Sequence, residues 1–169
     1  MAQVGRRVLC CADGSGGARV KPLFVICEDG TEYLDRFERF LGAEFRFVRT
    51  GSFGALVSTL GAPDGAPAGL VLDLDFRRTP QERLVNEEGA TVAAASAGEK
   101  QRVSAVQGLL ILRALRSRGV TLPALLCTDI DDPGQLEHLE AELSPLSVVP
   151  SSESLGKLAQ RLRDLAARS

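Results

Sequence analysis

Short apolar runs alternate with amphipathic segments along most of the chain. Runs typical of β-strands occur at residues 23–27, 44–49, 70–76, 124–128 and 146–149. Leucine, phenylalanine and valine recur at helical spacing over residues 32–41, 52–60, 104–117, 136–143 and 155–165. Five strands alternating with five helices predict an α/β fold, a three-layer sandwich in which helices cover both faces of a five-stranded parallel sheet. Because crossovers are right-handed, the flavodoxin-like (βα)5 strand order 2-1-3-4-5 is favoured.

Two segments depart from this alternation. Residues 1–20 include the sequence DGSGGA, whose composition predicts a flexible N-terminal tail. Residues 77–103, between the third strand and the third helix, are polar and rich in alanine and lack a periodic apolar face. They are too many for an ordinary βα loop of about two to six residues. We therefore expect one domain over residues 21–169 with an insertion at 77–103 that is either a mobile loop or partly helical.

The composition is that of a globular protein with no nucleic-acid footprint. Hydrophobic residues make up 44% of the 169 residues and charged residues 25%, and the net charge is −2. No apolar stretch approaches the roughly 18 residues of a membrane span. The four cysteines, Cys10, Cys11, Cys27 and Cys127, show no CxxC spacing and are expected to be buried free thiols. A reducing, cytoplasmic location follows from that reading.

Polar residues stand where three of the predicted strands end. The third run carries Asp73, the first is followed by Glu28 and Asp29, and the fourth ends at Thr128. Because parallel strands end at a common edge, we expect these side chains to converge where open α/β folds keep their chemistry. The only histidine, His138, lies on the polar side of a short predicted helix, so a histidine-based nucleophilic site has no support.

The order of the predicted elements and of these strand-end residues resembles that of the receiver domain of bacterial response regulators. The resemblance covers residues 22–168 apart from the insertion. In that family an acidic pair holds Mg²⁺, and an aspartate ending strand 3 accepts a phosphoryl group from a histidine kinase. The resemblance implies that Asp73 is the candidate phosphoacceptor, with the hydroxyl of Thr128 nearby. It also implies Glu28, Asp29 and Asp73 as candidate Mg²⁺ ligands, and carboxylate oxygens suit that ion. Taken alone, Glu28 and Asp29 would simply begin a helix, where acids favour the dipole.

The chain departs from the family's pattern at the residues that would handle a phosphoryl group. Val149 precedes Pro150 where the family has lysine, which removes a charge-assisted hydrogen bond of about 1.5–3 kcal/mol. Asp129 follows Thr128 where the family has a small residue, and it adds negative charge where phosphate would arrive.

Two further positions also depart from the family's pattern or add negative charge. Leu146 stands where many receivers carry a switching aromatic. Asp75 adds another carboxylate beside Asp73. Arg77 or Arg78, early in the insertion, would have to fold back to replace the missing lysine, and nothing in their sequence positions indicates that they do.

These departures favour a pseudo-receiver: a signalling or scaffolding domain, not an enzyme, that acts through protein–protein contact without phosphorylation. We expect no cofactor other than Mg²⁺ and no attached output domain. The partner is expected to be a histidine kinase, a signalling or motility-type complex, or a second copy of the chain, and neither nucleic acid nor membrane. The face built from the fourth helix, the fifth strand and the last helix, or else the insertion, would carry the contact. Its candidate residues are Leu136, Leu139, Leu146, Val149 and Leu155.

Two alternatives stay open. One is a working, Mg²⁺-dependent receiver that is phosphorylated at Asp73. The other is a haloacid-dehalogenase-type phosphatase, whose DxD motif the sequence DLDF resembles, with Asp73 as nucleophile and Asp75 as acid/base. Against the phosphatase, Phe76 and Arg77 stand where that family has Gly-Thr, and no later predicted strand ends in an acidic pair.

Overall fold

The computed structural model describes residues 20–62, 65–92 and 96–168, and the predicted tail, with Cys10 and Cys11, lies outside these ranges except for Val20. Within them the chain forms a parallel sheet of order β2-β1-β3-β4-β5, which confirms the predicted topology. The strands are β1 (Leu23–Cys27), β2 (Arg46–Thr50), β3 (Gly69–Asp73), β4 (Ala124–Thr128) and β5 (Leu146–Pro150).

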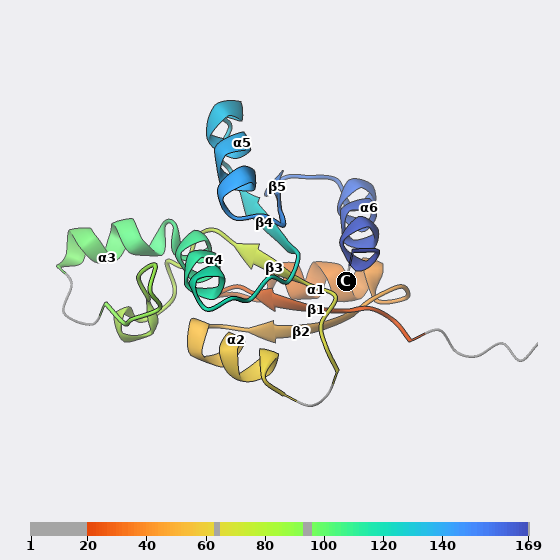
Figure 1. Ribbon diagram of the computed structural model, residues 1–169, viewed down its shortest axis with the longest axis horizontal. Helices are drawn as coiled ribbons and strands as arrows, with labels where there is room; N and C mark the ends of the chain where they lie inside the picture. Colours follow the sequence, from red (N-terminus) through yellow and green to blue (C-terminus); the bar gives the residue numbers. More distant parts are fainter. Residues whose placement is uncertain (1–19, 63–64, 93–95, 169) are drawn as a thin grey trace, which may run out of the picture.

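Helices cover both faces of the sheet (Figure 1). They are α1 (Glu32–Leu41), α2 (Phe53–Leu60), α3 (Ala97–Ser104), α4 (Gln107–Ser117), α5 (Pro133–Glu142) and α6 (Leu155–Ala166). Successive strand residues alternate between two apolar clusters, because side chains along a strand point to opposite faces. Phe24 and Ile26 pack with α1 and α6, whereas Val25 and Cys27 pack with α2, α4 and α5. Cys27 and Cys127 are buried free thiols, as expected.

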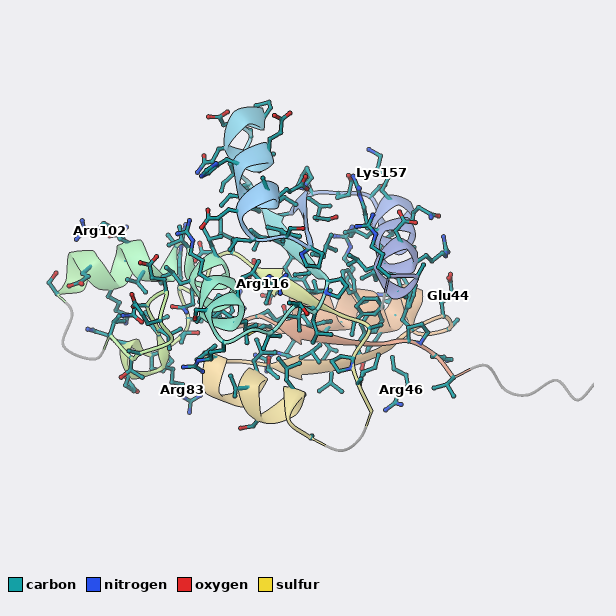
Figure 2. All side chains as sticks on the ribbon, in the orientation of Figure 1. Glu44, Arg46, Arg83, Arg102, Arg116 and Lys157 are labelled. Atoms are coloured by element: carbon teal, nitrogen blue, oxygen red, sulfur yellow. The ribbon has the colours of Figure 1, made fainter. Side chains whose placement is uncertain are left out.

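The described part of the insertion is partly helical. It contains the 3₁₀ helix η1 (Gln81–Arg83), an antiparallel bridge between Val85 and Thr91, and α3. α3 projects away from the sheet, and Arg102 on it points outward (Figures 1 and 2). Leu84 and Val85 are buried in the α2–α4–α5 cluster, although sequence periodicity did not single them out. Two isolated apolar residues in a polar segment thus attach the insertion to the domain.

The sheet edge that carries the predicted site is shaped by the end of β3. β3 ends at Asp73 rather than continuing to Phe76, and the Phe76 N–H donates to the Ser104 carbonyl at 2.8 Å. The third predicted helix is α4, which begins at Gln107 rather than at Ser104, because Ser104 is the last residue of α3. The chain therefore leaves the sheet at Asp73 and is tied there to the far end of the insertion.

Candidate functional site

The predicted strand-end residues converge at the carboxyl edge of the sheet. Glu28, Asp29 and Asp73 line one pocket of about 450 Å³. Asp73 also lines a neighbouring hollow of about 270 Å³ together with Thr128 and Asp129. The juxtaposition expected from parallel strand ends is therefore present, and the contacts of each side chain show what it is available to do.

Glu28 is a helix-capping residue in this structure. Its side chain is buried, and its two carboxylate oxygens accept the N–H groups of Tyr33 and Leu34, each at 3.0 Å. The residue that precedes α1, Thr31, makes no side-chain capping bond, so Glu28 satisfies the first turn instead. Its carboxylate also lies at the positive end of the helix dipole. These contacts agree with the alternative interpretation from the sequence, in which Glu28 is an acid at the start of a helix.

The two arginines that begin the insertion do fold back into the acidic pocket. The Arg78 N–H donates to Asp29 Oδ2 at 2.6 Å, and the Arg78 guanidinium pairs with Glu32. Arg77 pairs with Asp75 at 2.6 Å. Five carboxylates and three guanidiniums line this pocket, so much of its negative charge is offset by the chain itself.

Asp73 is half-buried and lines this mixed-charge pocket. Burial is the main cause that raises the pKa of Asp73 to about 7. The charges of Asp29, Glu28 and Asp75 raise it further, while a main-chain hydrogen bond from Asp75 acts in the opposite direction. A carboxyl group with this pKa is partly protonated at neutral pH and is then a poor nucleophile for phosphorus.

Three residues with hydroxyl groups, Thr128, Tyr33 and Ser151, line the hollows around Asp73. Thr128 is buried, and its Oγ1 accepts the N–H of Ile130 at 3.1 Å. The side chains of Tyr33 and Ser151 line the pocket beside Asp73, and burial raises the pKa of the Tyr33 phenol. Ser151 lines both hollows and its N–H donates to the Thr128 carbonyl at 3.0 Å, which ties the end of β5 to β4.

The end of β5 supplies no cation. Val149 is 2% exposed and packs in the α1–α6 cluster. The cation that reaches the pocket from α1 is Arg36, whose Nη2 donates to the Glu153 carbonyl at 2.8 Å. The sequence interpretation missed Tyr33, Arg36 and Ser151. A signal was present, since Tyr33 and Arg36 are three residues apart on one helix and Ser151 is the second residue after a predicted strand.

Three of the five residues expected to contact a partner are in the core. Leu139, Leu146 and Val149 are 3%, 8% and 2% exposed, so they cannot present a surface to another protein. Leu136 and Leu155 are half-buried and retain accessible surface. The physical reason is that apolar periodicity marks the inward side of each element, which the domain covers with its own helices.

Two of the three predicted Mg²⁺ ligands, Glu28 and Asp29, make hydrogen bonds within the chain. In residues 20–62, 65–92 and 96–168, no three His, Cys, Asp or Glu side chains are grouped so that they could hold a metal ion. Both Glu28 oxygens cap α1 and one Asp29 oxygen accepts the Arg78 N–H, so these three oxygens already accept hydrogen bonds within the chain. Among the described residues, no helix is long and apolar enough to span a membrane.

Comparisons with known proteins find the same architecture without sequence relatives. No protein-family model matches the chain, and no curated protein matches it. The receiver domain of Francisella response regulator 1452 superposes with a TM-score of 0.62 at 11% identity, covering 88% of this chain and 98% of that one.

Two other solved structures agree. The signal receiver domain of a putative LuxO repressor protein from Vibrio parahaemolyticus gives a TM-score of 0.61 at 10% identity, covering 88% of this chain and 92% of that one. The N-terminal receiver domain of a Bacteroides fragilis two-component response regulator gives 0.60 at 17% identity, covering 88% and 99%. The chain therefore has the flavodoxin-like fold of response-regulator receiver domains, as its strand-end residues implied.

Proposed function

We propose that this chain is a cytoplasmic, receiver-like signalling domain that acts through protein–protein contact and does not depend on phosphorylation of Asp73. It is not an enzyme in this proposal. The receiver fold supports a signalling role, and the contacts at the carboxyl edge of the sheet support independence from phosphorylation.

The observation that carries the proposal is the burial of Val149. A phosphoryl group on Asp73 would bring negative charge into a pocket already lined by Glu28, Asp29 and Asp75. At the position where receivers have lysine, this chain has an apolar side chain in the core. Nothing from β5 would then offset the added charge, and the three guanidiniums in the pocket already have partners, which disfavours the phosphorylated form.

Acetyl phosphate with Mg²⁺, followed by intact-mass measurement, tests this directly. We expect the wild-type mass to be unchanged under conditions that phosphorylate an active receiver treated in parallel. The matched control is Asp73→Asn, which removes the candidate acceptor and keeps its size. A gain of one phosphoryl mass in the wild type that is absent in Asp73→Asn would refute the proposal.

That result would establish the second candidate function, a working phosphoreceiver. One observation favours it: Asp73, Thr128 and Arg77 line the same 270 Å³ hollow, so a hydroxyl and a guanidinium stand near the acceptor. Arg77 is paired with Asp75 in this structure and would have to exchange partners to reach a phosphoryl group.

The site of partner contact needs surface variants rather than a deletion. Removing residues 80–102 would take Leu84 and Val85 out of the core and would confuse unfolding with loss of binding. Leu136→Glu tests the α5 surface, and Arg102→Glu tests α3. We expect quantitative affinity capture to lose the partner with one of these variants and to retain it with Asp73→Asn. Loss with Asp73→Asn alone would contradict the proposal.

A further inference from the structure

The Arg78 guanidinium lies in the acidic pocket that receivers use for a divalent cation. Arg78 pairs with Glu32, and its main-chain N–H donates to Asp29 Oδ2. The pairing with Glu32 raises the pKa of Arg78, and the negative charges of Glu32, Asp29 and Asp73 add to the effect. Arg78 thus contacts two of the pocket's carboxylates, Glu32 through its guanidinium and Asp29 through its main chain.

We propose that Arg78 is the permanent counter-charge of this pocket and takes the place of a divalent cation, so that Mg²⁺ must compete with the chain's own guanidinium. The inference deepens the proposed function and rests on it, because it explains how acids retained at the strand ends remain stable without metal. It also gives the beginning of the insertion a role, which is to neutralise the pocket beside Asp73.

Gly30 shows that the pocket accommodates this arrangement. A Cβ atom built on Gly30 would overlap both Glu32 Oε2 and Arg78 Nη1. The Arg78–Glu32 pair therefore fills the space that a side chain at position 30 would take. Any residue larger than glycine would have to displace the pair, which provides a second way to perturb it while keeping Arg78 in the chain.

Arg77 is the matched control for Arg78. It is the adjacent residue, carries the same charge and lines the same pocket, but it pairs with Asp75 rather than with Glu32. Arg78→Ala keeps the main-chain bond to Asp29, so it isolates the guanidinium. Comparison of Arg77→Ala with Arg78→Ala separates the specific effect from the general effect of removing one positive charge.

Mn²⁺ is the probe, measured by paramagnetic resonance at low ionic strength with no phosphoryl donor, and Mg²⁺ competition is read by calorimetry. We expect Arg78→Ala to bind Mn²⁺ at least about fivefold more tightly than the wild type, because a positive charge that lines the same pocket is removed. Gly30→Ala should show a gain in the same direction. Arg77→Ala should show a smaller gain, and Asp29→Asn added to Arg78→Ala should abolish the gain. Circular dichroism checks that each variant is folded.

Equal Mn²⁺ affinity of the wild type and Arg78→Ala would overturn the proposal, as would an equal gain in Arg77→Ala. The outcome is separable from that of the phosphorylation experiment. If the wild type is phosphorylated and Arg78→Ala still gains Mn²⁺ affinity, the proposed function fails and the assignment of Arg78 stands. If the wild type is not phosphorylated and Arg78→Ala gains nothing, the assignment fails and the proposed function stands.

Discussion

The main chain of Gly108 packs directly on the main chain of Asp73. The Gly108 N–H donates to the Leu74 carbonyl at 3.1 Å, and a Cβ atom at Gly108 would overlap the carbonyl oxygen of Asp73. The first turn of α4, which follows the insertion, is thus seated on the strand end that carries the candidate site. The contact links the position of the insertion to the geometry of Asp73.

Gly108→Ala should destabilise the domain by about 1–3 kcal/mol, because the added methyl group forces α4 away from β3. Urea unfolding measures the change. Gly156→Ala is the control, since Gly156 is also the second residue of its helix and has no atom within 4 Å of a Cβ built there. That variant should be neutral or slightly stabilising, by up to about 1 kcal/mol. Equal effects of the two substitutions would show that the close approach at Gly108 is not required.

Asp73→Asn should stabilise the domain increasingly as pH rises. The pKa of Asp73 is raised to about 7, so the folded state holds a proton that the unfolded chain releases near its ordinary value of about 4. The contribution of Asp73 to stability therefore declines between about pH 4 and pH 7, and the full penalty applies above pH 7. Allowing for partial exposure, we expect Asp73→Asn to be more stable by about 1–2 kcal/mol at pH 8.

Urea unfolding of both proteins from pH 5 to pH 8, in the presence of a chelator, measures this difference. A difference that does not change with pH would show that the Asp73 carboxyl is not perturbed by its surroundings. A difference of the opposite sign, with the wild type gaining on the variant as pH rises, would mean that Asp73 has a favourable ionic partner in the folded state.

Glu28→Ala should cost about 1–3 kcal/mol of folding free energy. The substitution leaves the N–H groups of Tyr33 and Leu34 without their acceptor at the partly buried start of α1. Thermal or urea unfolding measures the loss. Glu137→Ala, an exposed glutamate on α5, is the control and should change stability by no more than about 0.5 kcal/mol. If Glu28→Ala were equally mild, the acid would not be a structural cap.

Arg116→Lys should destabilise the domain by about 1–3 kcal/mol. The guanidinium is half-buried near the end of α4 (Figure 2) and donates to the carbonyls of Leu143, Val120 and Pro145 at 3.1, 2.7 and 3.1 Å. An ammonium group on a flexible chain cannot reach all three carbonyls in that geometry.

Arg113→Lys is the matched comparison on the same helix. Arg113 makes a bidentate pair with Glu142 near the surface, so the exchange should cost less than about 1 kcal/mol. Chemical denaturation of the two variants side by side gives both values. A smaller loss for Arg116→Lys than for Arg113→Lys would contradict the bracing role of Arg116 between α4 and the start of β5.

Much of the fold could be predicted because burial imposes a period on the sequence. The sequence LVLDLDF predicted a central strand with Asp73 at its functional edge, and β3 is that strand, although it ends at Asp73 and does not continue to Phe76. Leu84 and Val85 were missed because two apolar residues in a polar segment create no period, although both are in the core. Leu139 and Leu146 were assigned to a partner surface, but periodicity marks the side that the domain covers itself.

The sequence by itself determined the α/β architecture, the strand order and the convergence of Glu28, Asp29, Asp73 and Thr128, because these follow from local periodicity and from the geometry of parallel strands. Only the tertiary structure decided what each of these groups contacts. Glu28 caps α1, and Arg78 reaches the acidic pocket from the insertion. Such contacts depend on how side chains distant in sequence meet, and hydrophobic patterning carries no information about that.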